Sequence, residues 1–401
     1  MRAISVAGGL LALAMAGMMR VDAEHWAVIV AGSMGVLMGN ATATNGKKVL
    51  ASGSDDRVFV NFVDHGAPGV VVFPNEQLLT AKQLTGTLEK MYEQKRYKEL
   101  VFYVEACESG SMFRDEDMAR INAFVTTAAN ATESSWGYYC PPMDVIDGVS
   151  MNTCLGDLYS INWMQDSDRT DLSAETLREQ YRIVKAQTNL SHVKAFGAKH
   201  IRHEIVGNFQ SNYDHPPSSD GSADSGSDDD VAGDGIADED RRQAPLAGAV
   251  NSRDVNVVLA FYKYLRSDRG SERQASAEAL IREIESRERA DRLFESIKLT
   301  ALKINHATSP VDDETKKTAC RESMFQVFKE ECGGASDEER GIGNAFTSYS
   351  LQYAQSLSEM CGTFGDITTV RSILRESCAQ QERVNQGTRE SVYDEMVMAL
   401  A

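Results

Sequence analysis

A cysteine and a histidine, each placed shortly after an apolar run, are the residues of this sequence best able to do covalent chemistry. His65 follows the run at 58–63, and Cys107 follows the run at 100–104. A thiol becomes a strong nucleophile when it loses its proton, and a neighbouring imidazole can take that proton. The pair therefore indicates attack on a carbonyl carbon. Taken singly, Cys107 would be a small buried apolar residue and His65 a hydrogen-bonded residue at a strand end.

The two apolar runs and the segment between them predict how this pair is positioned. Both runs are short and rich in β-branched and aromatic residues, as buried strands of a parallel sheet are. Residues 82–97 between them have helical spacing, with apolar residues on one face at Leu84, Leu88 and Met91. A strand, a helix and a strand make a right-handed crossover, so both strands end at the same ligand-binding edge of the sheet.

Gly66 and Gly110 follow closely behind the histidine and the cysteine. Because glycine has no Cβ, backbone can approach a substrate there, and backbone N–H groups can hold an oxyanion. Two reactive residues at matching strand ends, each with a glycine behind it, favour a catalytic interpretation over two unrelated structural residues.

The composition limits the class of protein. The chain has 401 residues, a length that allows two domains. Its formal net charge of −18 argues against nucleic-acid binding.

Residues 1–23 are typical of a secretory signal, with Arg2 before an apolar stretch at 7–18 and small residues at a cleavage site. The alternative is a buried N-terminal strand or helix. No later stretch is long and apolar enough to span a bilayer.

The seven cysteines agree with an oxidising route, because six can pair and one is left over. We assign Cys107 as the unpaired one, and Cys140 with Cys154 can close one loop. Sequence alone allows three pairings of the other four. Metal binding is the rival interpretation, but neither a C-x-x-C spacing nor a paired histidine supports it, so we predict no metal. The four remaining cysteines are Cys320, Cys332, Cys361 and Cys378.

Two motifs around the reactive residues resemble those of a known family. They read Val63-Asp64-His65-Gly66 and Glu105-Ala106-Cys107-Glu108-Ser109-Gly110-Ser111-Met112. Both look like the catalytic motifs of the legumains, or asparaginyl endopeptidases, which are caspase-like cysteine peptidases. The resemblance runs from about residue 25 to the C-terminus. It implies a caspase-like α/β sheet flanked by helices, then an all-α, disulfide-stapled prodomain, in a zymogen without a cofactor.

The resemblance also implies an activity and roles for the reactive residues. The enzyme would cleave polypeptides after Asn, and after Asp at lower pH, and could ligate because an acyl-enzyme can be captured by an amine. Cys107 would be the nucleophile and His65 its base. The backbone N–H groups of Gly66 and Cys107 would form the oxyanion hole. Asp64 matches a position where the Asp can cyclise to a succinimide, whereas the sequence alone favours a turn cap.

Four further residues match the family's S1 pocket, which receives the side chain before the scissile bond. An Asn side chain offers a carbonyl and an NH2 group, and two acids would accept hydrogen bonds from the NH2. Without the resemblance, the two acids would be ordinary loop residues. The matching residues are Glu105, Ser134, Ser135 and Asp157.

The chain departs from the family pattern near residues 34–36. Members of the family carry several tens of residues there, which include a strand, an Asn that orients the catalytic histidine and an Arg of the substrate pocket. This chain instead passes directly from residue 33 to a segment that precedes the strand at 58–63. Loss of a strand and its helix would open a hole in the layers of the sheet. A missed exon is one account, and a truncated inactive product is the other. The second functional hypothesis is therefore a peptidase-like protein without activity that binds peptides.

Residues 214–254 separate the expected peptidase domain, residues 24–213, from the rest of the chain. The stretch 214–240 holds ten acidic residues and no Lys or Arg, a composition that cannot fold on its own. Residues 249–254 resemble the junction of plant-type legumains, which makes Asn251 a candidate self-processing site. The alternative for Asn251 is an N-cap of the next helix.

Residues 255–401 have helical periodicity and resemble the family's C-terminal prodomain, which covers the active site as an inhibitor. By resemblance, the disulfides would be Cys320–Cys361 and Cys332–Cys378.

The charges suggest that the prodomain is released from the peptidase domain in acid. Ionised Glu105, Glu108 and Asp157 would attract arginines of the prodomain, which would depress the pKa values of those acids. In the alternative, the arginines pair with neighbours on their own helix at Glu283, Glu285 and Glu288. The arginines are Arg282, Arg287, Arg289 and Arg292.

These features predict a protein of the secretory pathway, located in the vacuole, in the lysosome or outside the cell. Three glycosylation sequons agree with that route, although each is weak evidence alone. They begin at Asn40, Asn130 and Asn189.

Overall fold

The computed structural model describes residues 2–5, 25–30, 36–40, 42, 48–73, 78–210, 248–305, 314–332 and 347–388 of the chain. The chain forms two compact units: Met1–Tyr139 with Leu155–Ser252, and Cys140–Cys154 with Arg253–Ala401. The acidic stretch at 214–240 and most of the expected signal lie outside the described residues.

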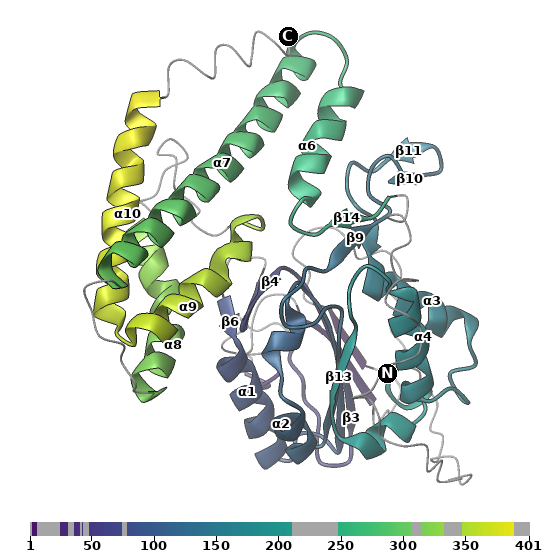
Figure 1. Cartoon of the computed structure of the whole chain (residues 1–401). Helices are drawn as coiled ribbons and strands as arrows, with labels where there is room; N and C mark the ends of the chain where they lie inside the picture. The colour runs from purple at the N-terminus through teal and green to yellow at the C-terminus, as the bar shows by residue number, and fades with distance from the viewer. Residues whose placement is uncertain are drawn as a thin grey trace. The chain divides into compact units, whose positions relative to one another are not determined.

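A six-stranded sheet forms the centre of the first unit (Figure 1). Its order is β1-β2-β3-β7-β8-β13, and neighbouring strands are parallel except for β13, which is antiparallel to β8. The predicted strands and the helix between them are confirmed. The strands are β1 (Arg2–Ser5), β2 (His25–Val30), β3 (Arg57–Val63), β7 (Glu99–Glu105), β8 (Ala123–Thr127) and β13 (Lys194–Gly197).

The central strand β7 shows why these residues form a sheet covered on both faces. All seven of its residues are buried. Successive side chains point to opposite faces, so Phe102 and Val104 join a core with α1 (Ala81–Glu93) and α2 (Asp115–Arg120). Val101 and Tyr103 join the opposite core with α3 (Leu158–Arg169) and α4 (Leu177–Gln187). Burial on both faces explains the continuous apolar runs.

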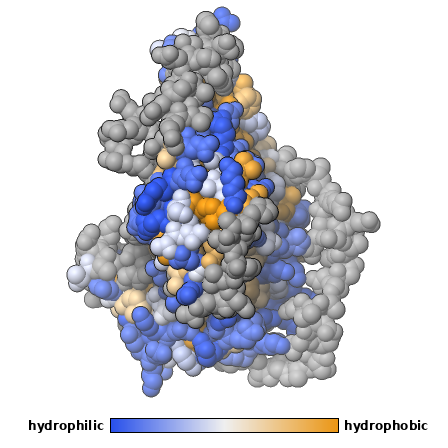
Figure 2. Space-filling model, turned by 60° about the vertical axis from the view of Figure 1, so that its left-hand side comes forward, coloured by the Kyte–Doolittle hydropathy of each residue, from blue (hydrophilic) through white to orange (hydrophobic). Residues whose placement is uncertain are grey.

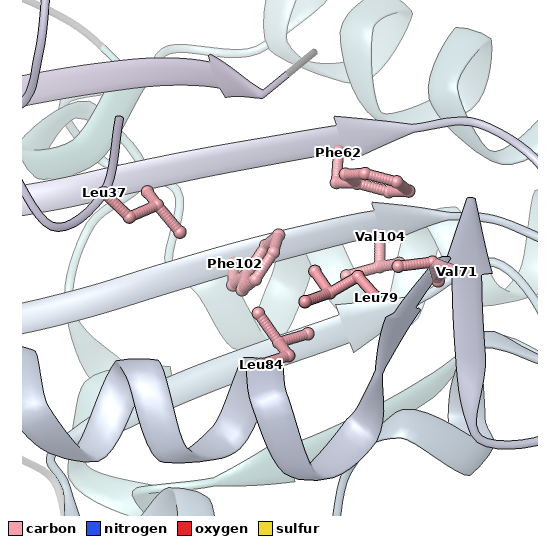
Figure 3. A pocket seen from close by; sticks show the side chains of 7 residues that line it. All are labelled: Leu37, Phe62, Val71, Leu79, Leu84, Phe102 and Val104. Carbon is pink, nitrogen blue, oxygen red and sulfur yellow. The ribbon is translucent and has the colours of Figure 1, made fainter. Parts of the chain in front are cut away.

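A three-stranded hairpin sheet follows the histidine loop. It contains β4 (Gly66–Ala67), β5 (Val70–Val72) and β6 (Leu78–Thr80), and it leads into α1, which begins with a capping box at Thr80. A pocket lies between this hairpin, α1 and the sheet (Figure 3). Its space for water-sized molecules is about 10 Å³, too small for a substrate. Its lining is apolar throughout: Leu37, Phe62, Val71, Leu79, Leu84, Phe102 and Val104.

Helix α4 begins after Thr176, whose side chain forms a capping box with Glu179. The segment 192–206 contributes the edge strand β13 and the short helix η2 (Lys199–His203), and it buries Val193, Ile201 and Val206. The remaining short elements include η1 (Ser109–Met112) and α5 (Gly207–Gln210).

A second small sheet in the first unit has the order β12-β9-β14. It contains β9 (Trp136–Tyr138), β12 (Gly156–Asp157) and β14 (Val250–Asn251). Asn251 therefore lies in a strand, and the next helix has Asp254 at its N-cap position, so the alternative of Asn251 as a helix cap is wrong.

The second unit is helical. It contains α6 (Val255–Arg266), α7 (Ser271–Asn305), α8 (Glu314–Cys332), η3 (Ser350–Tyr353), α9 (Ala354–Phe364) and α10 (Ile367–Thr388), with the hairpin β10 (Val145–Ile146) and β11 (Val149–Ser150). Disulfides join Cys320 to Cys361 and Cys332 to Cys378, the pairs that the resemblance implies, and tie α8 to α9 and α10. A third disulfide, Cys140–Cys154, closes the hairpin loop.

Strand β1 uses residues of the expected secretory signal, because Arg2–Ser5 pairs with β2. This pairing matches the alternative of an N-terminal strand, and removal of residues 1–23 stays a prediction. No helix among the described residues is long and apolar enough to cross a membrane. Hydrophilic side chains dominate the described surface in the view of Figure 2, interrupted by few apolar ones.

Candidate active site

Strand register sets the relation between His65 and Cys107. In the parallel pair β3–β7, Val63 lies opposite Glu105. The N–H of Asp64 continues the ladder by donating to the carbonyl oxygen of Glu105 at 3.1 Å. His65 and Cys107 are each two residues beyond that matched pair, so they leave the sheet together at its carboxyl edge, as predicted.

The two loops that carry these residues touch through Gly66. A Cβ added to Gly66 would lie 2.2 Å from the carbonyl oxygen of Cys107 and 3.0 Å from the Cβ of Ala106. Only glycine allows this close approach of two backbones. Gly66 therefore brings the histidine loop against the cysteine loop.

The thiol of Cys107 is buried, takes part in no disulfide, and lies beside polar groups of Ser135. The backbone N–H of Ser135 donates to Sγ at 3.3 Å, and the Ser135 hydroxyl lies 3.6 Å from Sγ. A cysteine that served only as a small apolar residue would not need a donor on its sulfur. A donor on Sγ stabilises a thiolate.

The loop after Cys107 is held by hydrogen bonds and by a second close glycine contact. Glu108 has a left-handed conformation with φ 49°, and its N–H donates to the carbonyl oxygen of Glu133 at 2.8 Å. A Cβ added to Gly110 would lie 2.9 Å from the backbone of Asn130. Asn130 and Glu133 belong to the loop that leads to Ser135, so the cysteine loop and this loop are fixed against each other.

Three carboxyl groups, on Asp64, Glu105 and Asp157, gather around this edge. Oε2 of Glu105 accepts hydrogen bonds at 2.9 Å from both the N–H and the hydroxyl of Ser160. Among the described residues, its buried Oε1 has no hydrogen-bond partner. Burial, and then the charge of Asp157, raise the pKa of Glu105 well above its ordinary value. Burial and Asp64 raise the pKa of Asp157 to about 6.

Asp64 is the third member of the acidic group. Its Oδ1 accepts the N–H of the next residue, His65, at 2.6 Å. Burial raises its pKa to about 6, although this hydrogen bond acts in the opposite direction. All three pKa values move upward, so the predicted depression of the pKa values of Glu105 and Asp157 is wrong. The reason is that burial beside like charges disfavours ionisation.

Comparison with known proteins identifies the family. The model of the peptidase C13 family matches residues 16–212. The vacuolar-processing enzyme delta-isozyme of Arabidopsis thaliana is 31% identical over 378 residues, which cover 89% of this chain and 74% of that protein. A vacuolar-processing enzyme of Ricinus communis is 32% identical over 381 residues, with coverages of 88% and 70%. Legumain of Mus musculus is 49% identical over 182 residues, with coverages of 44% and 39%.

The chain belongs to the peptidase C13 family. It is a cysteine endopeptidase whose substrates are polypeptides, and the resemblance drawn from the two motifs is confirmed. Its mixed α/β unit agrees with a caspase-like fold. Within the described residues, no group of His, Cys, Asp and Glu side chains could hold a metal ion.

In this C13 peptidase, the predicted arginines lie on α7 and pair with acids on that helix. Arg287 contacts Glu283 at 3.0 Å, and it also contacts Asp254 at 2.7 Å. Two further pairs along α7 join residues four apart: Arg289–Glu285 at 3.5 Å and Arg292–Glu288 at 3.4 Å. Pairing within the helix is the alternative that the sequence left open.

The structure adds residues to this C13 site that sequence reasoning missed. Ser160 binds Glu105, and Ser252 contacts Ser135 from the far end of the unit's chain. Their signal in the sequence is weak, because a serine in a helix or a junction has no distinctive pattern. Of the two predicted pocket serines, Ser135 contacts Cys107, whereas Ser134 is a partly exposed loop residue beside it.

Proposed function

We propose that this C13 peptidase is the precursor of an asparaginyl endopeptidase in which Cys107 is the nucleophile and His65 its base. The supporting observation is the parallel register of β3 and β7, with Gly66 against Cys107. Sγ attacks the carbonyl carbon, and the N–H groups of Gly66 and Cys107 stabilise the oxyanion. The amine leaves with a proton from His65. Water then hydrolyses the thioester, and an incoming amine in its place gives ligation.

The acidic group supports Asn as the residue before the cleaved bond. The free Oε1 of Glu105 can accept a hydrogen bond from the NH2 group of a bound Asn, and Asp157 is the second acceptor. Ser134 and Ser135 line the same pocket. A protonated Asp side chain also offers one donor and one acceptor, which explains cleavage after Asp at lower pH. In Asp64, the contact between the side chain and the N–H of His65 supports succinimide formation.

Processing at Asn251 completes the proposal. Strand β14 pairs antiparallel with β9, with Asn251 opposite Trp136, so the junction is already held as a strand in the unit that contains Cys107. β-strand addition is a common way of binding peptides. After the cut, the helical unit would leave as the released prodomain and inhibitor. Two of these relatives, from Arabidopsis thaliana and Ricinus communis, are named vacuolar-processing enzymes, which supports a vacuole or lysosome as the location.

The decisive experiment uses the full chain with Cys107→Ser and, separately, His65→Ala. Both variants should lose cleavage of an Asn-containing peptide, and Cys107→Ser should also lose labelling by a thiol-directed electrophile. A pH series with N-terminal sequencing then maps the processing site. Activity that persists in Cys107→Ser, or a cut far from residues 214–254, would contradict the proposal.

A second candidate is a peptidase-like protein that binds peptides without cleaving them. It is favoured by the short connection between Val30 of β2 and Arg57 of β3, where the sequence lacks a family strand and helix. Tight binding of an Asn peptide by the unmodified chain, together with no turnover at any pH, would select this candidate.

A further inference from the structure

The hydroxyl of Ser111 joins the cysteine loop to the hairpin that follows His65. Its oxygen accepts the N–H of Gly69 at 2.7 Å, across 42 positions of sequence. Its proton goes to the carbonyl oxygen of Glu108, 2.6 Å away, in the residue after Cys107. One short side chain thus connects the turn of the hairpin β4–β5 with the backbone beside the proposed nucleophile.

The turn at Gly69 is a fixed point for this contact. Its carbonyl oxygen accepts the N–H of Ala81, the first residue of α1, at 2.8 Å. The other end of the hairpin holds the histidine loop, because the N–H of Val72 donates to the carbonyl oxygen of His65 at 2.9 Å. Gly66 begins strand β4 of the same hairpin. His65, Gly66 and Gly69 therefore belong to one hydrogen-bonded substructure.

The segment that leads to the S1 serines holds the cysteine loop independently. The N–H of Gly110 donates to the carbonyl oxygen of Ala129 at 3.1 Å, and the N–H of Glu108 donates to the carbonyl oxygen of Glu133 at 2.8 Å. The cysteine loop is therefore attached both to this segment and to the hairpin. Removal of the Ser111 hydroxyl leaves the first attachment in place and weakens the second.

From these contacts we propose that Ser111 is a positioning residue that holds the cysteine loop at a fixed distance from His65 and from the Gly66 N–H. This inference rests on the proposed roles of His65, Gly66 and Cys107 in catalysis. Proton transfer and oxyanion stabilisation both weaken when the reacting groups are displaced, and a shift of about 1 Å can cost about 100-fold in rate.

The S1 pocket provides the contrast that tests this role. Its acid Glu105 is held by hydrogen bonds from Ser160, and its serines follow the segment that stays attached to the cysteine loop. Substrate binding therefore does not use the Ser111 hydroxyl, whereas the chemical step does. Ser111→Ala should lower kcat for an Asn-containing peptide about 10-fold and change KM by less than about twofold. Ser111→Thr, which keeps a hydroxyl, should recover most of the kcat.

Kinetics are measured on the full chain after incubation in acid, with processing states matched by mass. Active sites are counted with a chloromethyl ketone of an Asn-containing peptide, so that unfolded molecules do not enter kcat. Ser52→Ala is the matched control, because the Ser52 hydroxyl also donates to a backbone carbonyl oxygen, that of Arg96 at 2.5 Å, from a partly buried position. Ser52 and Arg96 precede the amino ends of β3 and β7, so this variant should keep kcat and KM.

The outcomes separate this inference from the proposed function. If Ser111→Ala keeps its kcat while Cys107→Ser is inactive, the inference is wrong and the proposed function stands. A rise in KM at constant kcat, an equal loss in Ser52→Ala, or a Ser111→Thr variant as slow as Ser111→Ala would also overturn the inference. If Cys107→Ser cleaves, or the unmodified chain never does, the proposed function fails and the inference fails with it.

Discussion

Gly66 lies directly against Cys107, and the space between them holds no side chain. A Cβ on Gly66 would come within 2.2 Å of the Cys107 carbonyl oxygen, a distance that real atoms do not tolerate. The histidine loop and the cysteine loop are therefore spaced by the smallest possible residue. This spacing keeps the backbone of Gly66 against the residue proposed as the nucleophile.

Gly66→Ala should lower the kcat of the peptidase about 100-fold or more, because displacing the Gly66 N–H removes one hydrogen-bond donor to the oxyanion. The added methyl pushes the two loops apart, and kcat should fall more than the folded fraction measured by circular dichroism. Gly86→Ala is the matched control, since a Cβ there meets nothing within 4 Å. Gly86 lies within α1, so this control should stabilise the protein by about 1 kcal/mol. Full activity in Gly66→Ala would contradict the assignment of the oxyanion hole.

Asp157→Asn should stabilise the protein at neutral pH. The folded-state pKa is raised to about 6, so between pH ~4 and about 6 the unfolded chain ionises while the folded carboxyl keeps its proton. Stability is therefore lost as pH rises through this window, and Asn removes the loss. Urea unfolding should show a gain of about 3 kcal/mol at pH 7 and almost none at pH 4. Asp168→Asn, at an exposed position on α3, the helix that follows Asp157, is the control.

Glu175→Gln should stabilise the protein by an amount that grows between pH ~4.5 and about 8. Burial and the neighbouring Asp166 raise the Glu175 pKa to about 8, so ionisation of the unfolded state progressively destabilises the fold from pH ~4.5 to about 8. The variant's melting temperature should exceed the wild-type value by a few degrees at pH 8.5, with a smaller difference at pH 5. Glu116→Gln, at an exposed position on α2, provides the control. Equal shifts at both pH values would argue against a titration effect.

Arg266→Ala should unfold the Cys140–Cys154 loop locally. Arg266 donates to both carboxylate oxygens of the fully buried Asp144, at 2.7 and 2.9 Å, and these bonds hold the pKa of Asp144 below its usual range. Stability from a depressed pKa is present above the unfolded value and lost only as pH falls through the folded one, so the pair persists in mild acid.

Removing one partner of such a pair costs about 3 kcal/mol. Limited proteolysis should therefore cut Arg266→Ala within the hairpin β10–β11 at a protease level that spares the wild type. Arg292→Ala removes an exposed pair within one helix and should cost less than about 0.5 kcal/mol. If the hairpin of Arg266→Ala resists proteolysis as well as that of Arg292→Ala, the Arg266–Asp144 pair does not stabilise the hairpin locally.

The sequence alone determined the strands, the crossover and the two reactive positions. Apolar runs as continuous as 58–63 and 100–104 fold as buried parallel strands, and whatever follows such strands lies at their common edge. Residue identity around Cys107 and His65 was specific enough to indicate the family. These features are local, since each depends on residues a few positions apart.

Tertiary structure decided the properties that depend on distant residues. Ser252 lies 117 positions from Ser135, and no local pattern connects them. The sign of the pKa shift at Asp157 depends on burial and on Asp64, neither of which can be read from a loop sequence. The arginines of α7 had two sets of possible acidic partners, and the choice followed from the helix bringing residues four apart together. Electrostatic and packing energies vary with three-dimensional distance, which sequence separation does not specify.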